Sequence, residues 1–152
     1  MAHVLETGFE ILNRENPNGS PTVMGYNIIN GELRPASDGE TFESRNPAWL
    51  DDCLGVFPLS KKEDVHDALI SAREAFSQWS QTPAPTRGQI IGNMGRLLME
   101  HKDDIVRVEA REIGKTLKES AGEVQEAIDT CLFFQSEGRR LYGQTVNSEL
   151  PD

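Results

Sequence analysis

The period of the hydrophobic residues changes at Ser60, and this change decides which secondary structures the two parts of the chain can form. Before Ser60, short apolar runs are separated by turn signals, a pattern typical of β-strands. After Ser60, apolar residues recur every three or four positions, which places them on one face of a helix. The first such series is Val65, Leu69, Ala72, Phe76 and Trp79. We therefore expect a small β unit followed by helices.

The β unit is predicted from its turns. Asn30-Gly31 supplies the positive φ angles of a type I′ turn, so a hairpin is expected between 27–29 and 32–34. Further strands are predicted over 41–44 and roughly 54–59, which would make a small antiparallel unit. Residues 1–26 contain the turn-rich run Asn-Arg-Glu-Asn-Pro-Asn-Gly-Ser-Pro, and we expect them to form a loosely attached arm.

Capping signals predict about four helices in the second part. Their starts are a capping box at Ser60 and Glu63, the proline-rich hinge 82–85, the acidic pair 103–104, and a second capping box at Thr116 and Glu119. Gly114 is expected to end the third helix. The fourth is expected to run to about Tyr142, with Gly143 as its cap. Its apolar stripe is Leu117, Ala121, Val124, Ile128, Cys131, Phe134 and Tyr142, and Phe133 lies almost opposite.

Charge and composition exclude several classes of protein. The chain has 15 basic and 25 acidic residues, a net charge of −10, and no basic cluster, which disfavours nucleic acid and acidic membrane surfaces as partners. No apolar run approaches the ~20 residues of a membrane span, and the N-terminus lacks the basic start of a secretory signal. Two cysteines do not make a disulfide framework. We therefore expect a cytoplasmic protein.

Motif searches predict no active site from the residues alone. Gly114-Lys115-Thr116 resembles part of a phosphate loop, but Glu109 stands where that motif needs a glycine, so a helix cap is the better interpretation. The glycines at 88, 92 and 95 do not have dinucleotide-binding spacing. Cys53 follows two aspartates, which disfavour a nucleophilic thiolate, and Cys131 belongs to an apolar stripe. The three histidines have no metal-ligand spacing.

The order of several short segments is more informative. They are Ile-Asn-Gly-Glu at 29–32, Gly-Glu-Thr-Phe at 39–42, Arg-Asn-Pro-Ala at 45–48, Thr-Pro-Ala-Pro-Thr-Arg at 82–87, Glu-Ala-Arg-Glu-Ile-Gly-Lys at 109–115, and Leu-Tyr-Gly-Gln-Thr at 141–145. In this order and spacing, residues 27–152 resemble the N-terminal portion of the NAD(P)-dependent aldehyde dehydrogenase superfamily. The run 123–129 is most similar to its semialdehyde-oxidising branches.

The resemblance implies a partial α/β fold of the aldehyde dehydrogenase type. Residues 27–143 would form the N-terminal part of the coenzyme-binding domain, a β-hairpin unit followed by helices, and 144–152 would begin an oligomerisation strand. The parallel sheet and the catalytic domain would lie outside this chain. The implied partners are further copies of the chain or the missing C-terminal part of the same enzyme.

The resemblance also implies a function for the parent enzyme. That enzyme would oxidise an aldehyde to the carboxylic acid through a covalent thioester, with hydride transfer to NAD or NADP. No catalytic or cofactor-binding residue can be carried over to this chain, so the chain alone is expected to be inactive and to bind no cofactor. One site carries over as a monovalent cation site, formed by the Glu112 carboxylate and the carbonyls of Ser44 and Arg45.

Two other interpretations stay open at this stage. The chain could be an interaction module that docks on full-length subunits through its orphan strand and apolar faces. It could also be an inert, truncated remnant, in which case its exposed apolar surface would bind a hydrophobic dye.

Overall fold

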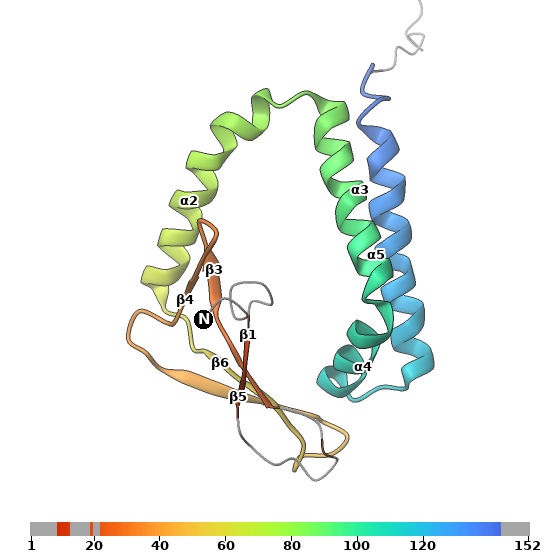
Figure 1. The fold of residues 1–152 in the computed structure, drawn as a ribbon. Coiled ribbons are helices and arrows are strands. Elements are labelled where there is room, and N and C mark those ends of the chain that lie inside the picture. The colour runs from red at the N-terminus through yellow and green to blue at the C-terminus, as the bar shows by residue number, and fades with distance from the viewer. Residues whose placement is uncertain (1–8, 13–18, 20–21, 144–152) are drawn as a thin grey trace, which may run out of the picture.

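The computed structural model describes residues 9–12, 19 and 22–143. In Figure 1 the described part forms an arch, with α2 (Lys62–Gln81) as one side. Two helices, α3 (Ala84–Glu100) and α5 (Leu117–Glu137), run side by side as the other. The strands and the short helix α4 (Lys102–Ile113) lie at the opposite end from the α2–α3 connection. The predicted order, a β unit followed by four helices, is confirmed.

A four-stranded sheet forms the larger β element. Its order is β1 (Phe9–Leu12), β2 (Thr22–Gly25), β6 (Cys53–Pro58) and β5 (Thr41–Arg45). The β1–β2 and β5–β6 pairs are antiparallel, but β2 and β6 run parallel, with Val23 opposite Gly55. The predicted strands over 41–44 and 54–59 pair antiparallel, as expected, and β2, which lies outside the predicted strands, makes the sheet mixed. Turn signals report which strands are joined by hairpins, whereas the β2–β6 pairing is between segments distant in sequence.

The segment expected to be a loosely attached arm contributes two strands to this sheet. Both β1 and β2 lie within residues 1–26, and the turn-rich run separates them along the chain. The Thr22 side chain is fully buried and its hydroxyl donates to the Cys53 carbonyl at 3.2 Å. The second strand of this segment is therefore anchored to the neighbouring β6.

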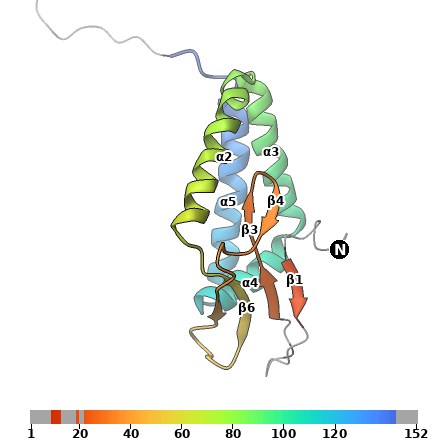
Figure 2. The same cartoon turned by 90° about the vertical axis from the view of Figure 1, so that its left-hand side faces the viewer.

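The predicted hairpin is confirmed as β3 (Asn27–Ile29) and β4 (Glu32–Arg34). Asn30 and Gly31 have φ angles of 54° and 74°, the positive pair that a type I′ turn requires. The hairpin forms a separate two-stranded sheet that lies against α2 (Figure 1, Figure 2).

Two helix ends differ from expectation. The carboxylate of the capping box at the start of α2 is Asp64 rather than Glu63, since the Lys61 N–H donates to Asp64 Oδ2 at 2.7 Å. The helix therefore begins one residue later than predicted. The end of α5 is Glu137 rather than Tyr142. After it, the N–H groups of Arg139 and Arg140 donate to carbonyls three residues back, at 3.1 and 2.9 Å, so the last turn tightens at Gly138.

The hydrophobic core lies between α4 and α5. Val106, Val124 and Ile128 are buried, with Leu98, Ile105 and Ala121 packed around them. On α3 the buried residues are Gly88, Gly92 and Gly95, and a Cβ at Gly88 would lie 2.5 Å from the Gln135 carbonyl oxygen of α5. These glycines let α3 and α5 approach more closely than side chains would permit.

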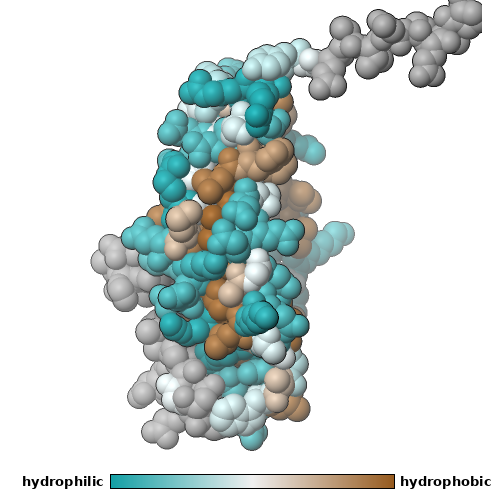
Figure 3. Space-filling model, turned by 90° about the vertical axis from the view of Figure 1, so that its right-hand side faces the viewer, coloured by the Kyte–Doolittle hydropathy of each residue, from teal (hydrophilic) through white to brown (hydrophobic). Residues whose placement is uncertain are grey.

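Much of the predicted apolar surface is exposed. On α2, Leu69 and Phe76 are 65% and 63% exposed, and on α5 Phe134, expected on the buried stripe, is 54% exposed. Phe133 is exposed too and packs edge-to-face on Phe134. On the side that α5 forms, apolar side chains gather in an interrupted band along the molecule (Figure 3).

Among the described helices, none combines the length and apolarity that crossing a membrane requires.

Candidate functional site

A buried ion pair joins the helical part to the sheet. Asp52 precedes β6 and is fully buried, and the Arg111 guanidinium of α4 donates to both of its carboxylate oxygens, at 3.0 and 2.7 Å. Asn46 adds a side-chain bond of 3.3 Å and a backbone bond of 3.0 Å to Asp52. Bidentate geometry of this kind fixes orientation as well as distance, so it sets how α4 sits on the sheet.

Gly114 tightens the same junction. It ends α4 with a φ of 73°, as the sequence predicted, and a Cβ there would lie 2.8 Å from Pro47 and 2.9 Å from the Ala48 nitrogen. Only glycine combines that backbone conformation with so close an approach. The interpretation of 114–116 as a helix end followed by a helix start is therefore confirmed over a phosphate loop.

The three residues predicted to hold a cation belong to two elements that contact each other. Ser44 and Arg45 end β5, where the register with β6 shifts between them, and α4, which carries Glu112 in its last turn, contacts β5. The Arg45 side chain donates to the Leu50 carbonyl at 2.8 Å and to Glu43 at 2.6 Å. Glu112 is exposed. In the described part of the chain, no group of three or more His, Cys, Asp or Glu side chains could hold a metal ion.

A second charged cluster lies between the C-terminal end of α4 and the start of α5. Lys115 contacts Glu109 at 3.0 Å and forms a shorter ion pair with Glu123. The Glu123 partner raises the pKa of Lys115, and Lys115 lowers the pKa of Glu123. In the adjoining capping box, the Thr116 hydroxyl and N–H both donate to Glu119 and lower its pKa. Lys115 therefore links α4 to α5 through two carboxylates, Glu109 on α4 and Glu123 on α5.

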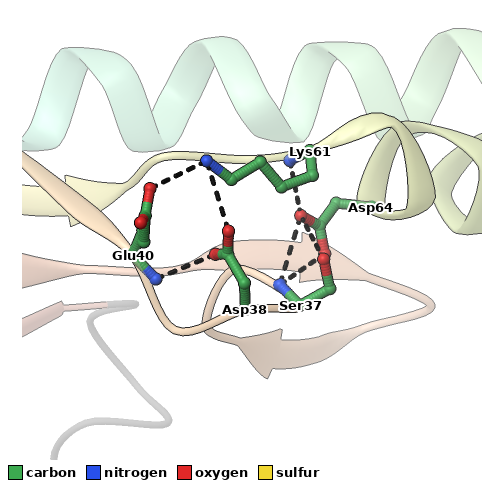
Figure 4. A network of polar contacts seen from close by, with 5 residues as sticks. All are labelled: Ser37, Asp38, Glu40, Lys61 and Asp64. Atoms are coloured by element: carbon green, nitrogen blue, oxygen red, sulfur yellow. Dashed lines mark hydrogen bonds and ion pairs between the residues drawn. The ribbon is translucent and has the colours of Figure 1, made fainter.

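A polar network fixes the start of α2 (Figure 4). Asp64 accepts from the Lys61 N–H at 2.7 Å and from the Ser37 N–H at 3.0 Å, so one carboxylate ties the helix start to the preceding turn. Lys61 Nζ lies 2.9 Å from Glu40 and 3.2 Å from Asp38. The bond from the Lys61 N–H, followed by those from Ser37, holds the pKa of Asp64 below its ordinary value.

The lowered pKa of Asp64 predicts a pH-dependent contribution to stability. A depressed folded-state pKa stabilises the fold above about pH 4, the ordinary Asp value, and this contribution is lost as the pH falls through the folded-state pKa. Asp64→Asn should therefore lower the melting temperature at pH 7, and its difference from the wild type should shrink as the pH falls through the folded-state pKa of Asp64. Thermal melts between pH 2 and 7 measure this, with Glu63→Gln as a matched control in the same first turn of α2. A difference between Asp64→Asn and the wild type that stays constant across this range would contradict the assignment.

Neither cysteine has the surroundings of a catalytic thiolate. Cys53 and Cys131 are both buried, at 5% and 6% exposure. Cys53 Sγ lies 3.8 Å from the Gly55 carbonyl, and Cys131 packs under Gly95, where an added Cβ would lie 2.8 Å from Cys131 Cβ. Both thiols therefore act as small apolar groups that fill the interior.

The comparisons with known proteins identify the family. The sequence model of the aldehyde dehydrogenase family matches residues 34–152. This chain belongs to the aldehyde dehydrogenase family. The α-ketoglutarate semialdehyde dehydrogenase of Haloferax volcanii is 36% identical over 126 residues, which cover 83% of this chain and 26% of that protein. The succinate-semialdehyde dehydrogenase [NADP(+)] of Escherichia coli is 36% identical over 125 residues, 82% of this chain and 26% of that protein.

Solved aldehyde dehydrogenase structures match the fold. A betaine aldehyde dehydrogenase of Staphylococcus aureus, in complex with NAD+, superposes with a TM-score of 0.74 at 28% identity, over 84% of this chain and 26% of its own. An NAD-dependent aldehyde dehydrogenase of Sinorhizobium meliloti superposes with a TM-score of 0.79 over 94% of this chain and 29% of its own. At 22% identity, this likeness shows the fold alone. The chain therefore spans about a quarter of the length of the relatives it matches.

The described residues of this aldehyde dehydrogenase chain do not fit a nicotinamide cofactor. A pyrophosphate needs glycine backbone open to the ligand at a helix start. Here α5 occupies the space beside the α3 glycines, since a Cβ at Gly92 would collide with the Gln135 side chain. The start of α5 is occupied by the Thr116 and Glu119 capping box, whose carboxylate repels phosphate.

The sequence missed the Asp52–Arg111 pair and the role of the α3 glycines. Asp52 is one of two consecutive aspartates and Arg111 is one of several helical arginines, so no local pattern distinguishes them. The spacing of Gly88, Gly92 and Gly95 is visible in the sequence, but it does not show that a second helix packs against them.

Proposed function

We propose that this chain supplies the N-terminal part of the coenzyme-binding domain of an enzyme that oxidises an aldehyde or semialdehyde to the carboxylic acid with NAD or NADP. The observation that carries the proposal is the family match over 34–152, combined with coverage of about a quarter of the relatives. The names of the relatives, which act on α-ketoglutarate, succinate and malonate semialdehydes, favour a semialdehyde substrate.

In this proposal the chain is scaffold rather than catalyst. Its partner is the C-terminal part of the same enzyme or another copy, and its location is the cytoplasm. Residues 144–152, proposed as the start of an oligomerisation strand, lie outside the described residues. The division into 1–26, 27–143 and 144–152 belongs to the same proposal.

The chain alone is expected to show no aldehyde-dependent NADH or NADPH formation. Both cysteines are buried, and the described residues offer no binding site for the cofactor. The described part of the chain therefore lacks both the accessible thiolate and the hydride acceptor that the reaction needs. Absorbance at 340 nm with succinate semialdehyde measures this, with the full-length Escherichia coli relative as positive control. Turnover that Cys53→Ser or Cys131→Ser abolishes would overturn the proposal.

We also propose the monovalent cation site at Glu112 and the carbonyls of Ser44 and Arg45. Its support is that α4, which carries Glu112, contacts β5, which carries Ser44 and Arg45. At constant ionic strength, replacing choline by sodium or potassium should raise the melting temperature of the wild type and not that of Glu112→Gln. An equal rise in both proteins would remove Glu112 from the site.

The interaction-module alternative draws on one observation, the exposed aromatic pair Phe133 and Phe134. Such a module would bind a complete aldehyde dehydrogenase subunit, whereas the scaffold proposed above would bind only one that lacks its own N-terminal part. Pull-down with the full-length relative separates the two, because capture of the complete subunit is expected only from the module.

A further inference from the structure

One strand of the larger sheet would be an unfavourable outer strand. β6 has the sequence Cys-Leu-Gly-Val-Phe-Pro, so it carries no charge along its length, and its first four residues are buried. An uncharged apolar strand with a free edge is the kind of segment that pairs with another chain. The two strands that do lie outermost are different. β5 carries Glu43 and Arg45, and β1 has only four residues, and charged or short strands are the usual outer strands of a sheet.

β2 covers the edge of β6 and is fixed at its first residue. The two strands run parallel, with Val23 opposite Gly55. Thr22 is fully buried, and its hydroxyl donates to the Cys53 carbonyl at 3.2 Å. A buried hydroxyl needs such a partner, so this hydrogen bond sets where β2 begins along β6.

Gly25 fixes the other end of β2, because a side chain does not fit there. A Cβ at Gly25 would collide with the Phe57 ring of β6, which also lies 6.0 Å from the Phe42 ring of β5. On β6 itself, a Cβ at Gly55 would lie 2.7 Å from the Val23 carbonyl oxygen. An aromatic ring placed over a glycine of the neighbouring strand covers main chain that would otherwise be exposed. The β6 edge therefore fits a strand with threonine and glycine three positions apart.

The covering strand lies outside the residues that match the family. The family model begins at residue 34, so β6 is inside the match, whereas β1 and β2 precede it. The role of β2 has to be inferred from its own contacts, and those contacts are with β1 and the β6 edge.

We infer that residues 22–25 act as an internal blocking strand, which occupies the β6 edge and prevents β6 from pairing with β6 of a second copy of this chain. A second copy is the partner that an open β6 would meet, because every molecule would offer the same edge. Two uncharged copies of one strand pair without bringing like charges together, and such a contact is self-complementary. The inference does not depend on the proposed function.

The test opens the edge with one substitution and measures the result at Cys53. Gly25→Val places a branched side chain against the Phe57 ring, so β2 should leave β6. In dilute protein, alkylation by N-ethylmaleimide should become about tenfold faster at Cys53, as mass spectrometry of each cysteine-containing peptide measures. Cys131 is buried to the same degree, at 6% against 5% exposure, but it packs beneath Gly95 of α3. Its rate should therefore change less than about twofold.

Protein concentration then tests the role of the second copy. In Gly25→Val, raising the concentration should slow the alkylation of Cys53 again, because a second copy covers the same edge. Sedimentation velocity should show dimers or larger species at about threefold the fraction found for the wild type at equal concentration. Met24→Val, a change to the same residue type at the adjacent position of β2, is the matched control and should leave both measurements unchanged.

A compensating variant separates loss of the blocking strand from general damage. Gly25→Val combined with Phe57→Ala removes the ring that the new side chain meets, so β2 should return to β6. Both the Cys53 rate and the sedimentation profile should then move back toward those of the wild type.

Three results would overturn the inference. An unchanged Cys53 rate in Gly25→Val would show that glycine is not needed for β2 to cover β6. A rise of equal size at Cys53 and Cys131 would show that the whole fold opens instead of one strand. A faster rate at Cys53 alone, without added self-association at any concentration, would show that an open β6 edge does not pair with a second copy.

Discussion

Replacing Asp52 with alanine is expected to destabilise the chain by about 3–5 kcal/mol, the usual cost of breaking a buried ion pair. Asp52 is fully buried and Arg111 only 19% exposed, so the substitution leaves a guanidinium without its bidentate partner in a site that water barely reaches. A domain of this size has a total stability of about 5–15 kcal/mol, so the variant should unfold far earlier in urea. Equilibrium urea unfolding measures the difference.

The control for this prediction replaces both partners. Asp52→Leu combined with Arg111→Met removes the charges together and leaves apolar side chains of similar volume, which often costs little. The double variant should therefore be more stable than either Asp52→Ala or Arg111→Ala. A loss below about 1 kcal/mol for Asp52→Ala would show that the pair behaves like an exposed ion pair and does not hold α4 on the sheet.

Replacing Gly88 with alanine is expected to destabilise the chain by up to about 2 kcal/mol, although alanine is the better helix former. The gain in helix propensity is about 1 kcal/mol, and overpacking a tight contact costs about 1–3 kcal/mol. The added methyl would lie 2.5 Å from the Gln135 carbonyl oxygen, which is main chain and cannot rotate away. The helices must then separate, which also weakens the packing of Cys131 beneath Gly95.

A second glycine on the same helix pair provides the matched control. Gly122 is on α5, is exposed, and has nothing within 4 Å of an added Cβ. Gly122→Ala should therefore stabilise the chain by about 0.5–1 kcal/mol through helix propensity alone. Thermal and urea unfolding of both variants should give shifts of opposite sign. Stabilisation by Gly88→Ala would contradict the close contact between α3 and α5.

Short sequence motifs correctly predicted the turns and helix ends whose conformation depends only on neighbouring residues. The Asn30-Gly31 turn, the Gly114 cap and the box at Thr116 and Glu119 each depend on the conformation of a few consecutive residues, and each is confirmed. The predicted end of α5 at Tyr142 was wrong because the apolar spacing continues past Gly138, whereas the helix tightens there against Ala84. The cation site at Ser44, Arg45 and Glu112 stays a prediction.

The sequence by itself determined the order of the hairpin, the two following strands and the helices, the apolar spacing along each helix, and the family, because periodicity, caps and segment order are properties of neighbouring residues. Only the tertiary structure decided which faces are covered. It paired β2 with β6, joined Asp52 to Arg111 across 59 positions, and left Phe134 exposed while burying Ile128 on the same stripe. Burial depends on a packing partner from elsewhere in the chain. A hydrophobic stripe indicates that a helix face needs such a partner, but it does not indicate which segment provides it.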